Sequence, residues 1–440
     1  MADSWLRIIA SLFLAVWLLV APFNFAWYGP RQTAASDGIQ VVESSASHSF
    51  AQQITFTLQA TSGAEITHVY LFFRAEGDGQ TYSDAIDIDE PSQEINVSYS
   101  HDLRRSPLLP FATVTFWWQI EDATGQSLNT ASDPDQFEYT DNRFQWNALS
   151  AEGITIHWIE GQGDPVFGQA ALDIALASVE EINAELGAPV PKSIRIYIYD
   201  TQPNLDRAMA LTGREWVVGQ AHPELGVVLV TIPPDSGTGY KWRMRRYIPH
   251  EITHLLVYQA VGASNYSYVP EWLDEGLATA NEQLPTPEHA LVLEDARAQG
   301  QLIPLQSLCV SFEPNPQTAF LAYAQSGSLV RFIREWRGAS GIRGLLTAYA
   351  NGASCTSGVL EALNIEVSDL EAAWLASLAP EQETEQEIEQ ETGQQAELEP
   401  QAQRQVEVEE VGFWVSLSVL GLLLAVSMIG GGLHPEYRTE

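Results

Sequence analysis

The stretch Pro249-His250-Glu251-Ile252-Thr253-His254-Leu255-Leu256 decides the fold and the chemistry expected of this chain. Residues four apart on an α-helix share one face, so His250 and His254 can direct imidazole nitrogens at one metal ion about 2 Å from each. Glu251 lies about 100° further round the helix, where its carboxylate reaches a water on the ion. The spacing predicts a site for one zinc per chain. The competing interpretation is a buried histidine pair without metal.

A second stretch offers the third ligand. Glu275 follows His254 by 21 residues, within Trp272-Leu273-Asp274-Glu275-Gly276-Leu277-Ala278. A catalytic zinc held by two histidines needs one more protein ligand and keeps a position for water. We therefore expect Glu275 to bind the metal. Asp274 and Thr279 are candidates for the groups that accept the remaining ring N–H of a ligating histidine.

These two stretches, PHEITHLL and WLDEGLA, resemble the gluzincin clan of zinc peptidases, in particular the peptidase-MA-like domains of bacterial envelope proteins. The resemblance covers about residues 150 to 378. It implies that His250, His254 and Glu275 bind zinc and that Glu251 is the general base of a peptidase that attacks peptide bonds with an activated water.

The resemblance also implies a tyrosine or histidine near the oxyanion, on a later helix. Tyr323, within AFLAYAQSGSLVRFIREW (319–336), fits that role as a catalytic residue, and Tyr349 is a weaker candidate. A tyrosine that only packs on a helix face is the alternative for Tyr323. The chain has no Gly-x-Met-Glu-Asn segment, with which aminopeptidases of the clan grip a free N-terminus. We therefore expect an endopeptidase.

Composition bounds the other possibilities. The 440 residues include 57 acidic and 21 basic side chains, a formal charge of −36. A nucleic-acid binder needs a basic footprint, so this class is not expected. The hydrophobic share of 45% excludes a wholly disordered chain, and the length suggests two or three domains.

Residues 38–147 alternate in the manner of β-strands, for example at Ile54, Phe56 and Leu58 and again from Ile66 to Phe72. Short alternating strands separated by turn clusters predict an all-β, immunoglobulin-like sandwich at 37–148. The pattern then changes to strands at 154–159, 193–199 and 226–232, a helix at about 168–186, and mainly helices to about residue 378. This order predicts an α+β domain at 149–380, which the resemblance makes zincin-like.

Both ends of the chain carry apolar segments. Residues 411–433 contain no charge over a length that exceeds the roughly 30 Å core of a bilayer, and predict a transmembrane helix followed by a short tail at 434–440. Residues 1–30 predict either a secretory signal or an uncleaved N-terminal anchor. Between 381 and 410 stand eleven Glu and one Arg, which indicate a disordered acidic linker or a cation-binding segment. The expected location is the cell membrane, with the catalytic domain extracytoplasmic.

The chain has two cysteines, Cys309 and Cys355. Export to an oxidising compartment favours a disulfide between them, which would stabilise the fold by about 4 kcal/mol on the chain-entropy model. Two buried free thiols are the alternative.

Two features flank the metal motif. Residues 216–221 (WVVGQA) indicate either the edge strand along which gluzincins bind an extended peptide or an ordinary strand. Four basic residues precede the motif, and indicate either a preference for acidic substrates or pairing with this acidic protein. Because basic side chains oppose the dipole of a helix start, the metal helix is expected to begin near Pro249. The basic residues are Lys241, Arg243, Arg245 and Arg246.

The favoured function is a membrane-anchored zinc metallopeptidase with a protein or peptide substrate. Two alternatives stay open. One is a surface-binding or adhesion protein in which the β-sandwich acts and the zincin domain is a scaffold. The other is hydrolysis of a non-peptide bond in an envelope polymer, which no sequence feature separates from proteolysis.

Overall fold

A computed structural model gives the fold of the chain. It describes residues 38–209, 218–234, 239–310, 312–313 and 315–378, and these described residues belong to one compact unit. The predicted N-terminal segment (1–30), acidic linker (381–410), transmembrane helix (411–433) and tail (434–440) lie outside the described residues. Within the described ranges, no helix combines the length and the apolar character that crossing a bilayer requires.

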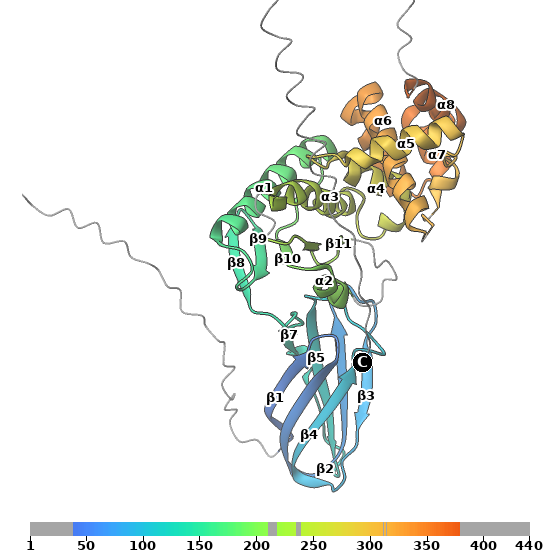
Figure 1. The fold of residues 1–440 in the computed structure, drawn as a ribbon. Helices are drawn as coiled ribbons and strands as arrows, with labels where there is room; N and C mark the ends of the chain where they lie inside the picture. The colour runs from blue at the N-terminus through green and yellow to red at the C-terminus, as the bar shows by residue number, and fades with distance from the viewer. Residues whose placement is uncertain (1–37, 210–217, 235–238, 311, 314, 379–440) are drawn as a thin grey trace, which may run out of the picture. The chain divides into compact units, whose positions relative to one another are not determined.

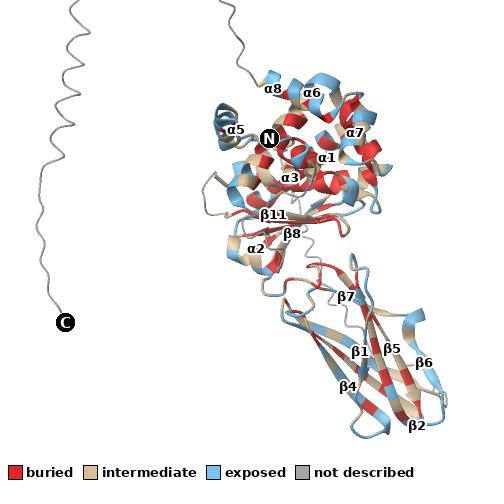
Figure 2. Ribbon diagram, turned by 90° about the vertical axis from the view of Figure 1, so that its right-hand side faces the viewer, coloured by how far each residue is buried: buried red, intermediate tan, exposed pale blue. Residues whose placement is uncertain are grey.

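The N-terminal region is rich in antiparallel strands that alternate buried and more exposed residues, as Figure 2 shows along β5. The alternation follows from the pleat, which points successive side chains to opposite faces. The elements are β1 (Gln40–Ser49), β2 (Gln53–Ala75), β3 (Tyr82–Ile86), β4 (Ser92–Asp102), β5 (Thr113–Asp122), β6 (Ser127–Asn129), the short helix η1 (Thr130–Ser132) and β7 (Asp135–Glu138).

One long strand, β2, belongs to both layers of this region. Its residues 53–61 pair with β1 and β4, and its residues 66–75 pair with β3 and β5. The rings of Phe56 and Phe73 lie 5.0 Å apart, although a straight strand would separate them by roughly 55 Å. The strand therefore bends between its halves and folds them face to face. The sequence pattern predicted two strands here, and the immunoglobulin-like strand order stays a prediction.

A second sheet follows, with strand order β11-β12-β10-β9-β8 (Figure 1). The inner strands β9, β10 and β12 run parallel, whereas β11 and β8 pair antiparallel at the two edges. The predicted strands at 154–159, 193–199 and 226–232 match β9, β10 and β12. The bounds are β8 (Trp146–Ala151), β9 (Ile154–Ile159), β10 (Ile194–Tyr199), β11 (Gly219–His222) and β12 (Val227–Thr231).

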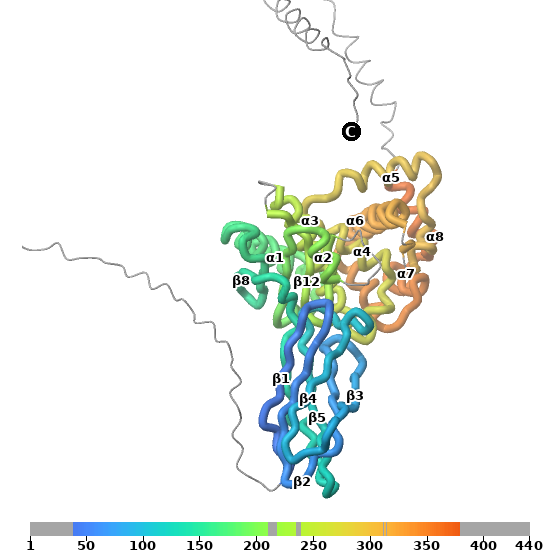
Figure 3. Tube along the Cα trace, turned by 60° about the horizontal axis from the view of Figure 1, so that its bottom comes forward, coloured from blue at the N-terminus to red at the C-terminus, as the bar shows by residue number. Residues whose placement is uncertain are grey.

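The later part of the chain is mainly helical, as its pattern predicts (Figure 3). The first of these helices starts at an Asp164 side chain that accepts from the backbone N–H of Phe167, and it ends at Gly187 in the left-handed conformation. The elements are α1 (Pro165–Leu186), α2 (Gln202–Met209), α3 (Gly239–Val261), η2 (Tyr266–Tyr268), α4 (Glu271–Ala280), α5 (Pro287–Gln299), η3 (Ser307–Cys309), α6 (Pro316–Ala350), α7 (Cys355–Leu363) and α8 (Val367–Ser377).

Both faces of the second sheet are covered, with α1 and α3 on one face and α2 on the other (Figure 2). Every residue of β12 is buried, which is the pattern of a strand with protein on both sides. Val228 and Val230 join the hydrophobic cluster of the helices, whereas Val227 and Leu229 join a cluster that continues into the N-terminal region. The two regions therefore share a hydrophobic core.

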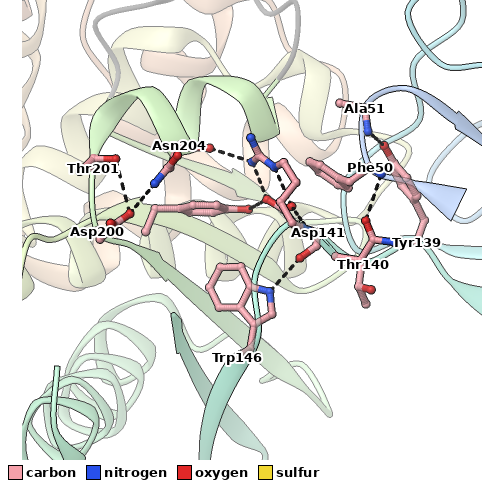
Figure 4. Close-up of polar contacts among 12 residues, drawn as sticks. Phe50, Ala51, Tyr139, Thr140, Asp141, Trp146, Asp200, Thr201 and Asn204 are labelled. Atoms are coloured by element: carbon pink, nitrogen blue, oxygen red, sulfur yellow. Dashed lines mark hydrogen bonds and ion pairs between the residues drawn. The ribbon is translucent and has the colours of Figure 1, made fainter. Parts of the chain in front are cut away.

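The junction between the two regions is also polar (Figure 4). The fully buried Asp141 accepts a hydrogen bond of 3.0 Å from the hydroxyl of Tyr199 and pairs with Arg143 at 2.6 Å. Arg143 donates in turn to the carbonyl oxygen of Asn204 at 3.0 Å. Beside this network, the ring of Phe111 stacks on Tyr197 with centroids 3.5 Å apart. The ion pair and the hydrogen bonds thus offset the cost of burying the Asp141 carboxylate, which would be high for an unpaired charge.

A disulfide joins Cys309 and Cys355, with the Cα atoms 5.8 Å apart, which confirms the predicted pairing. It links η3 to the start of α7. The indole nitrogen of the fully buried Trp272, on α4, donates to the Sγ atom of Cys355 at 3.3 Å. The cross-link therefore also contacts the helix that carries Glu275.

Candidate active site and metal centre

The motif residues lie in the second half of α3, which begins at Gly239. The expectation that this helix begins near Pro249 is therefore wrong. Proline lacks the N–H that would bond the carbonyl of Arg245, four residues earlier. That carbonyl instead accepts from the backbone N–H of Gln283 at 2.9 Å, beyond the end of α4. The proline is tolerated because a neighbouring segment replaces the lost hydrogen bond.

Three side chains converge as the sequence predicted. His250, His254 and Glu275 offer ligand atoms within 4.8 Å of one another. The Oε2 atom of Glu275 lies 3.4 Å from Nε2 of His250 and 3.5 Å from Nε2 of His254. Ligands at about 2.0–2.2 Å in a tetrahedral zinc site stand about 3.4 Å apart. Among the described residues this buried Oε2 atom has no hydrogen-bond partner, so the three residues fit a zinc ion.

Close packing of α4 on α6 holds Glu275 in position. A Cβ atom added at Gly276 would lie 2.7 Å from the carbonyl oxygen of Ser326, and one at Gly327 would lie 2.6 Å from the Thr279 side chain. Real Cβ atoms do not approach so closely, so these two glycines allow the helix backbones to meet. The adjacent Glu275 is directed toward the histidines of α3.

Two carboxylates orient the histidine rings. Oδ2 of Asp274 lies 3.0 Å from Nδ1 of His254, and the hydroxyl of Tyr266 donates to the same oxygen at 2.7 Å. Oε1 of Glu282 lies 3.3 Å from Nδ1 of His250. A carboxylate thus lies beside Nδ1 of each ring, while Nε2 of each ring faces Glu275.

The outcome for these supporting residues is mixed. The structure places Asp274 where the sequence suggested, but Thr279 packs against Gly327 and has a buried hydroxyl without a hydrogen-bond partner among the described residues. Sequence reasoning missed Tyr266 and Glu282. Glu282 stands seven residues after Glu275, but the helix ends at Ala280, so helical spacing alone does not place it.

Glu251 is buried and lies against the edge strand β11. A Cβ atom added at Gly219 would stand 2.5 Å from Oε1 of Glu251. The glycine thus leaves room for the carboxylate between the metal helix and the sheet edge. The predicted strand at 216–221 overlaps β11 at residues 219–221, and residues 216 and 217 of the prediction lie outside the described residues.

The two tyrosines considered as catalytic candidates, Tyr323 and Tyr349, lie in different places. The hydroxyl of Tyr323, on α6, donates to Oε1 of Glu275 at 3.2 Å, and its ring lies 6.4 Å from that of His250. Tyr349 is fully buried and donates to the carbonyl oxygen of Cys355 at 3.0 Å. The structure therefore brings Tyr323 to the candidate site and places Tyr349 in the core.

The electrostatics of the site reflect burial and mixed charge. Burial raises the pKa of the Glu251 carboxyl, although the two nearby imidazoles oppose the shift. Burial lowers the pKa of His250, but the neighbouring carboxylates of Glu275 and Glu282 outweigh it and raise that pKa to about 10. The imidazoles hold the pKa of Glu275 below its usual range against the effect of burial. Glu275 is thus ready to bind a cation.

The basic residues before the motif include ones that contact neighbours. Nε of Arg246 lies 3.7 Å from Oε2 of Glu282, and the guanidinium groups of Arg243 and Arg246 lie 4.8 and 4.9 Å from the ring of Trp242. These contacts fit pairing within the protein. A preference for acidic substrates stays a prediction.

Comparison with known proteins supports this geometry. Residues 173–380 match the family model described as the Peptidase MA superfamily. This match and the convergence of the two histidines with Glu275 support a zincin-like peptidase-MA domain. No curated protein matches the chain.

Solved structures resemble parts of the chain. An aminopeptidase N family protein from Idiomarina loihiensis shows 10% identity and a TM-score of 0.35, with 74% of each chain covered. Catalytically inactive OgpA from Akkermansia muciniphila, in complex with an O-glycopeptide substrate, shows 10% identity and a TM-score of 0.19 over 26% of this chain and 32% of that chain. The chain thus spans about a third of the OgpA length.

Proposed function

We propose that this protein is a zinc metallopeptidase of the cell membrane whose catalytic domain lies outside the cytoplasm. One observation carries the proposal: the buried Oε2 of Glu275, which has no hydrogen bond within the described ranges, faces the Nε2 atoms of His250 and His254, with Glu251 beside them. A buried carboxylate with no metal or proton to bind would be costly. The peptidase-MA domain assignment agrees with this chemistry.

The residues around the site divide the work of hydrolysis. Zinc, when bound by His250, His254 and Glu275, supplies a Lewis acid that polarises the scissile carbonyl and acidifies water. Glu251 accepts the proton of the attacking water and passes it to the leaving amine. Its burial suits this role, because a raised pKa brings a carboxyl closer to neutral pH. The Tyr323 hydroxyl donates a hydrogen bond to the carbonyl oxygen as negative charge develops on it.

The edge strand supports an endopeptidase. β11 is the last strand of its sheet and pairs with β12 on one side. An extended peptide can pair with such a strand through backbone hydrogen bonds, which require no free terminus. Gly219 on this strand contacts the Glu251 carboxylate, so a peptide bound there passes the general base.

The location rests on the apolar segment at 411–433 and on the disulfide. A disulfide between Cys309 and Cys355 persists outside the reducing cytoplasm. We expect residues 411–433 to span the membrane and the acidic residues 381–410 to separate the enzyme from its surface. The N-terminal segment then enters the membrane as a cleaved signal or as a second anchor.

The test measures metal content and hydrolysis on the full chain purified in detergent. Mass spectrometry should find about one zinc per chain in the wild type and in Glu251→Gln, and little in His254→Ala. The matched control His68→Ala removes an exposed histidine of β2 and should keep its zinc. Hydrolysis of a panel of unfolded proteins should be lost in Glu251→Gln and retained in the control.

Full hydrolysis by Glu251→Gln would contradict the assigned base. A wild-type chain that binds zinc but cleaves no panel member would favour the scaffold hypothesis, in which the N-terminal region does the binding. Product analysis separates peptide bonds from other bonds, because each new peptide terminus is identified by its mass.

A further inference from the structure

The half of β2 at residues 66–75 pairs with β3 and β5, and the outer face of these strands carries a row of aromatic side chains. Along β2, Val69, Leu71 and Phe73 point into the core, so His68, Tyr70 and Phe72 point outward. Trp117 on β5 stands directly opposite Phe72 in the register. Tyr70, Phe72 and Trp117 are half-buried and His68 is exposed. We call His68, Tyr70, Phe72 and Trp117 the aromatic row.

The rings of this row are mutually aligned. Phe72 and Trp117 have centroids 5.6 Å apart and ring planes that differ by 8°. His68 and Tyr70 have centroids 6.4 Å apart and planes that differ by 5°. Cross-strand aromatic pairs stabilise a sheet, but a structural pair needs only two rings. The two pairs together extend the aromatic surface along β2 and across to β5.

Polar groups border the aromatic row, and its two charged neighbours, Glu121 opposite His68 and Arg74 two residues beyond Phe72, have opposite signs. The register places Ser83 beside Phe72, and Gln119 beside Tyr70 with Asn129 beyond it. Hydroxyl and amide groups both donate and accept hydrogen bonds. Gln119 donates to Oε1 of Glu121 at 2.8 Å, which orients its amide next to the row.

The combination selects one class of ligand. Aromatic faces bury the C–H faces of sugar rings, while amides and hydroxyls bond the sugar hydroxyls at their edges. The chain's charge of −36 repels anionic polymers and anionic membranes. An apolar protein partner would leave the flanking amides without hydrogen bonds. A neutral polysaccharide satisfies both the rings and their polar border.

We propose that the aromatic row, with its border of Ser83, Gln119 and Asn129, binds a neutral polysaccharide chain. The site lies on strands β2, β3, β5 and β6, and none of its residues belongs to the metal site. Binding is therefore independent of hydrolysis. Its effect is to hold the enzyme on a glycan while the metal site acts on a nearby substrate.

The test uses calorimetric titration of the full chain in detergent with three hexasaccharides, β-1,4-linked glucose, N-acetylglucosamine and mannose. At least one should bind the wild type. Trp117→Ala should weaken that affinity at least tenfold, whereas Trp117→Phe should stay within about threefold because a ring remains. Trp336→Ala removes an exposed tryptophan of α6 and is the matched control with unchanged affinity.

A second variant guards against misfolding. Tyr70→Ala should weaken binding while thermal unfolding stays close to that of the wild type, and Glu251→Gln should bind as the wild type does. Absence of binding to all three sugars would overturn the proposal. So would binding that Trp117→Ala leaves unchanged. A dimer in sedimentation velocity that Trp117→Ala dissociates would show a protein interface on this face and overturn it as well.

Discussion

Replacing Gly219 with alanine puts a methyl group against the proposed general base. The added Cβ would stand 2.5 Å from Oε1 and 3.0 Å from the carboxyl carbon of Glu251. Ordinary van der Waals contact begins at 3.4 Å, so the carboxylate must move by 3.4 − 2.5 = 0.9 Å. The metal ligands on α3 and α4 are not touched by this change.

The displacement should reduce catalysis far more than stability. A misplacement of about 1 Å in a catalytic group can cost about a hundredfold in rate, so kcat/KM should fall between about ten- and a hundredfold, or about 1.4 to 2.7 kcal/mol. The methyl group meets the end of the flexible Glu251 side chain, which can rotate away, and it approaches Cγ1 of Val230 at 3.1 Å, where a shift of a few tenths of an ångström suffices. The free energy of unfolding should therefore change by less than about 1 kcal/mol.

The assay compares zinc content, thermal unfolding and hydrolysis of a fluorescently quenched unfolded protein. Gly344→Ala is the matched control, because its new Cβ would meet its nearest neighbour, Ala362, at an ordinary 3.4 Å. Hydrolysis by Gly219→Ala within threefold of the wild type would refute the placement of the base against β11. Loss of zinc together with activity would show that the strand supports the metal site instead.

Four further perturbations test the fold and the site. The ring of His157 stacks on Tyr197, and burial and then the nearby Arg195 lower its pKa from 6.5 to about 4. Because the pKa of His157 is lower in the folded chain, the unfolded chain takes up the proton first as the pH falls. Urea titrations should therefore show the free energy of unfolding fall by up to about 3 kcal/mol between pH 6.5 and pH 4. The fall should be smaller in His157→Gln. Phe111→Ala should cost about 3 to 5 kcal/mol and, by circular dichroism and fluorescence, shift the unfolding of both regions together. Replacing both cysteines by serine should lower the free energy of unfolding by up to about 4 kcal/mol. Tyr323→Phe should keep its zinc and lose about tenfold or more in kcat, and an unchanged kcat would assign the ring to packing.

The helical part of the site was predictable because one helix period relates its residues. His250 and His254 share a face through their spacing, and Asp274 follows from its place beside Glu275. Glu282 was not predictable, because it lies beyond the end of α4. Its approach to His250 depends on the hydrogen bond between Gln283 and the carbonyl of Arg245, a contact made only in the folded chain.

The sequence predicted where strands occur better than it predicted how they continue and what covers them. β9, β10 and β12 were predictable as short apolar runs, and the structure buries most of their side chains, all of them in β12. The sequence pattern could not show that β2 continues through residues 62–65, because the bend there interrupts the alternation. Nor could it show that Tyr197 and Tyr199 face the N-terminal region, since which partner covers a strand is decided by packing between distant segments.

Because the two regions share a core, the order in which the ribosome makes them affects how the second sheet is covered. The N-terminal region emerges first from the ribosome and contains the residues that later cover the second sheet, among them Phe111 and Asp141. When β10 appears, its tyrosines meet a surface that is already present. A chain whose synthesis began after residue 148 would have to fold that sheet without the residues that cover one of its faces.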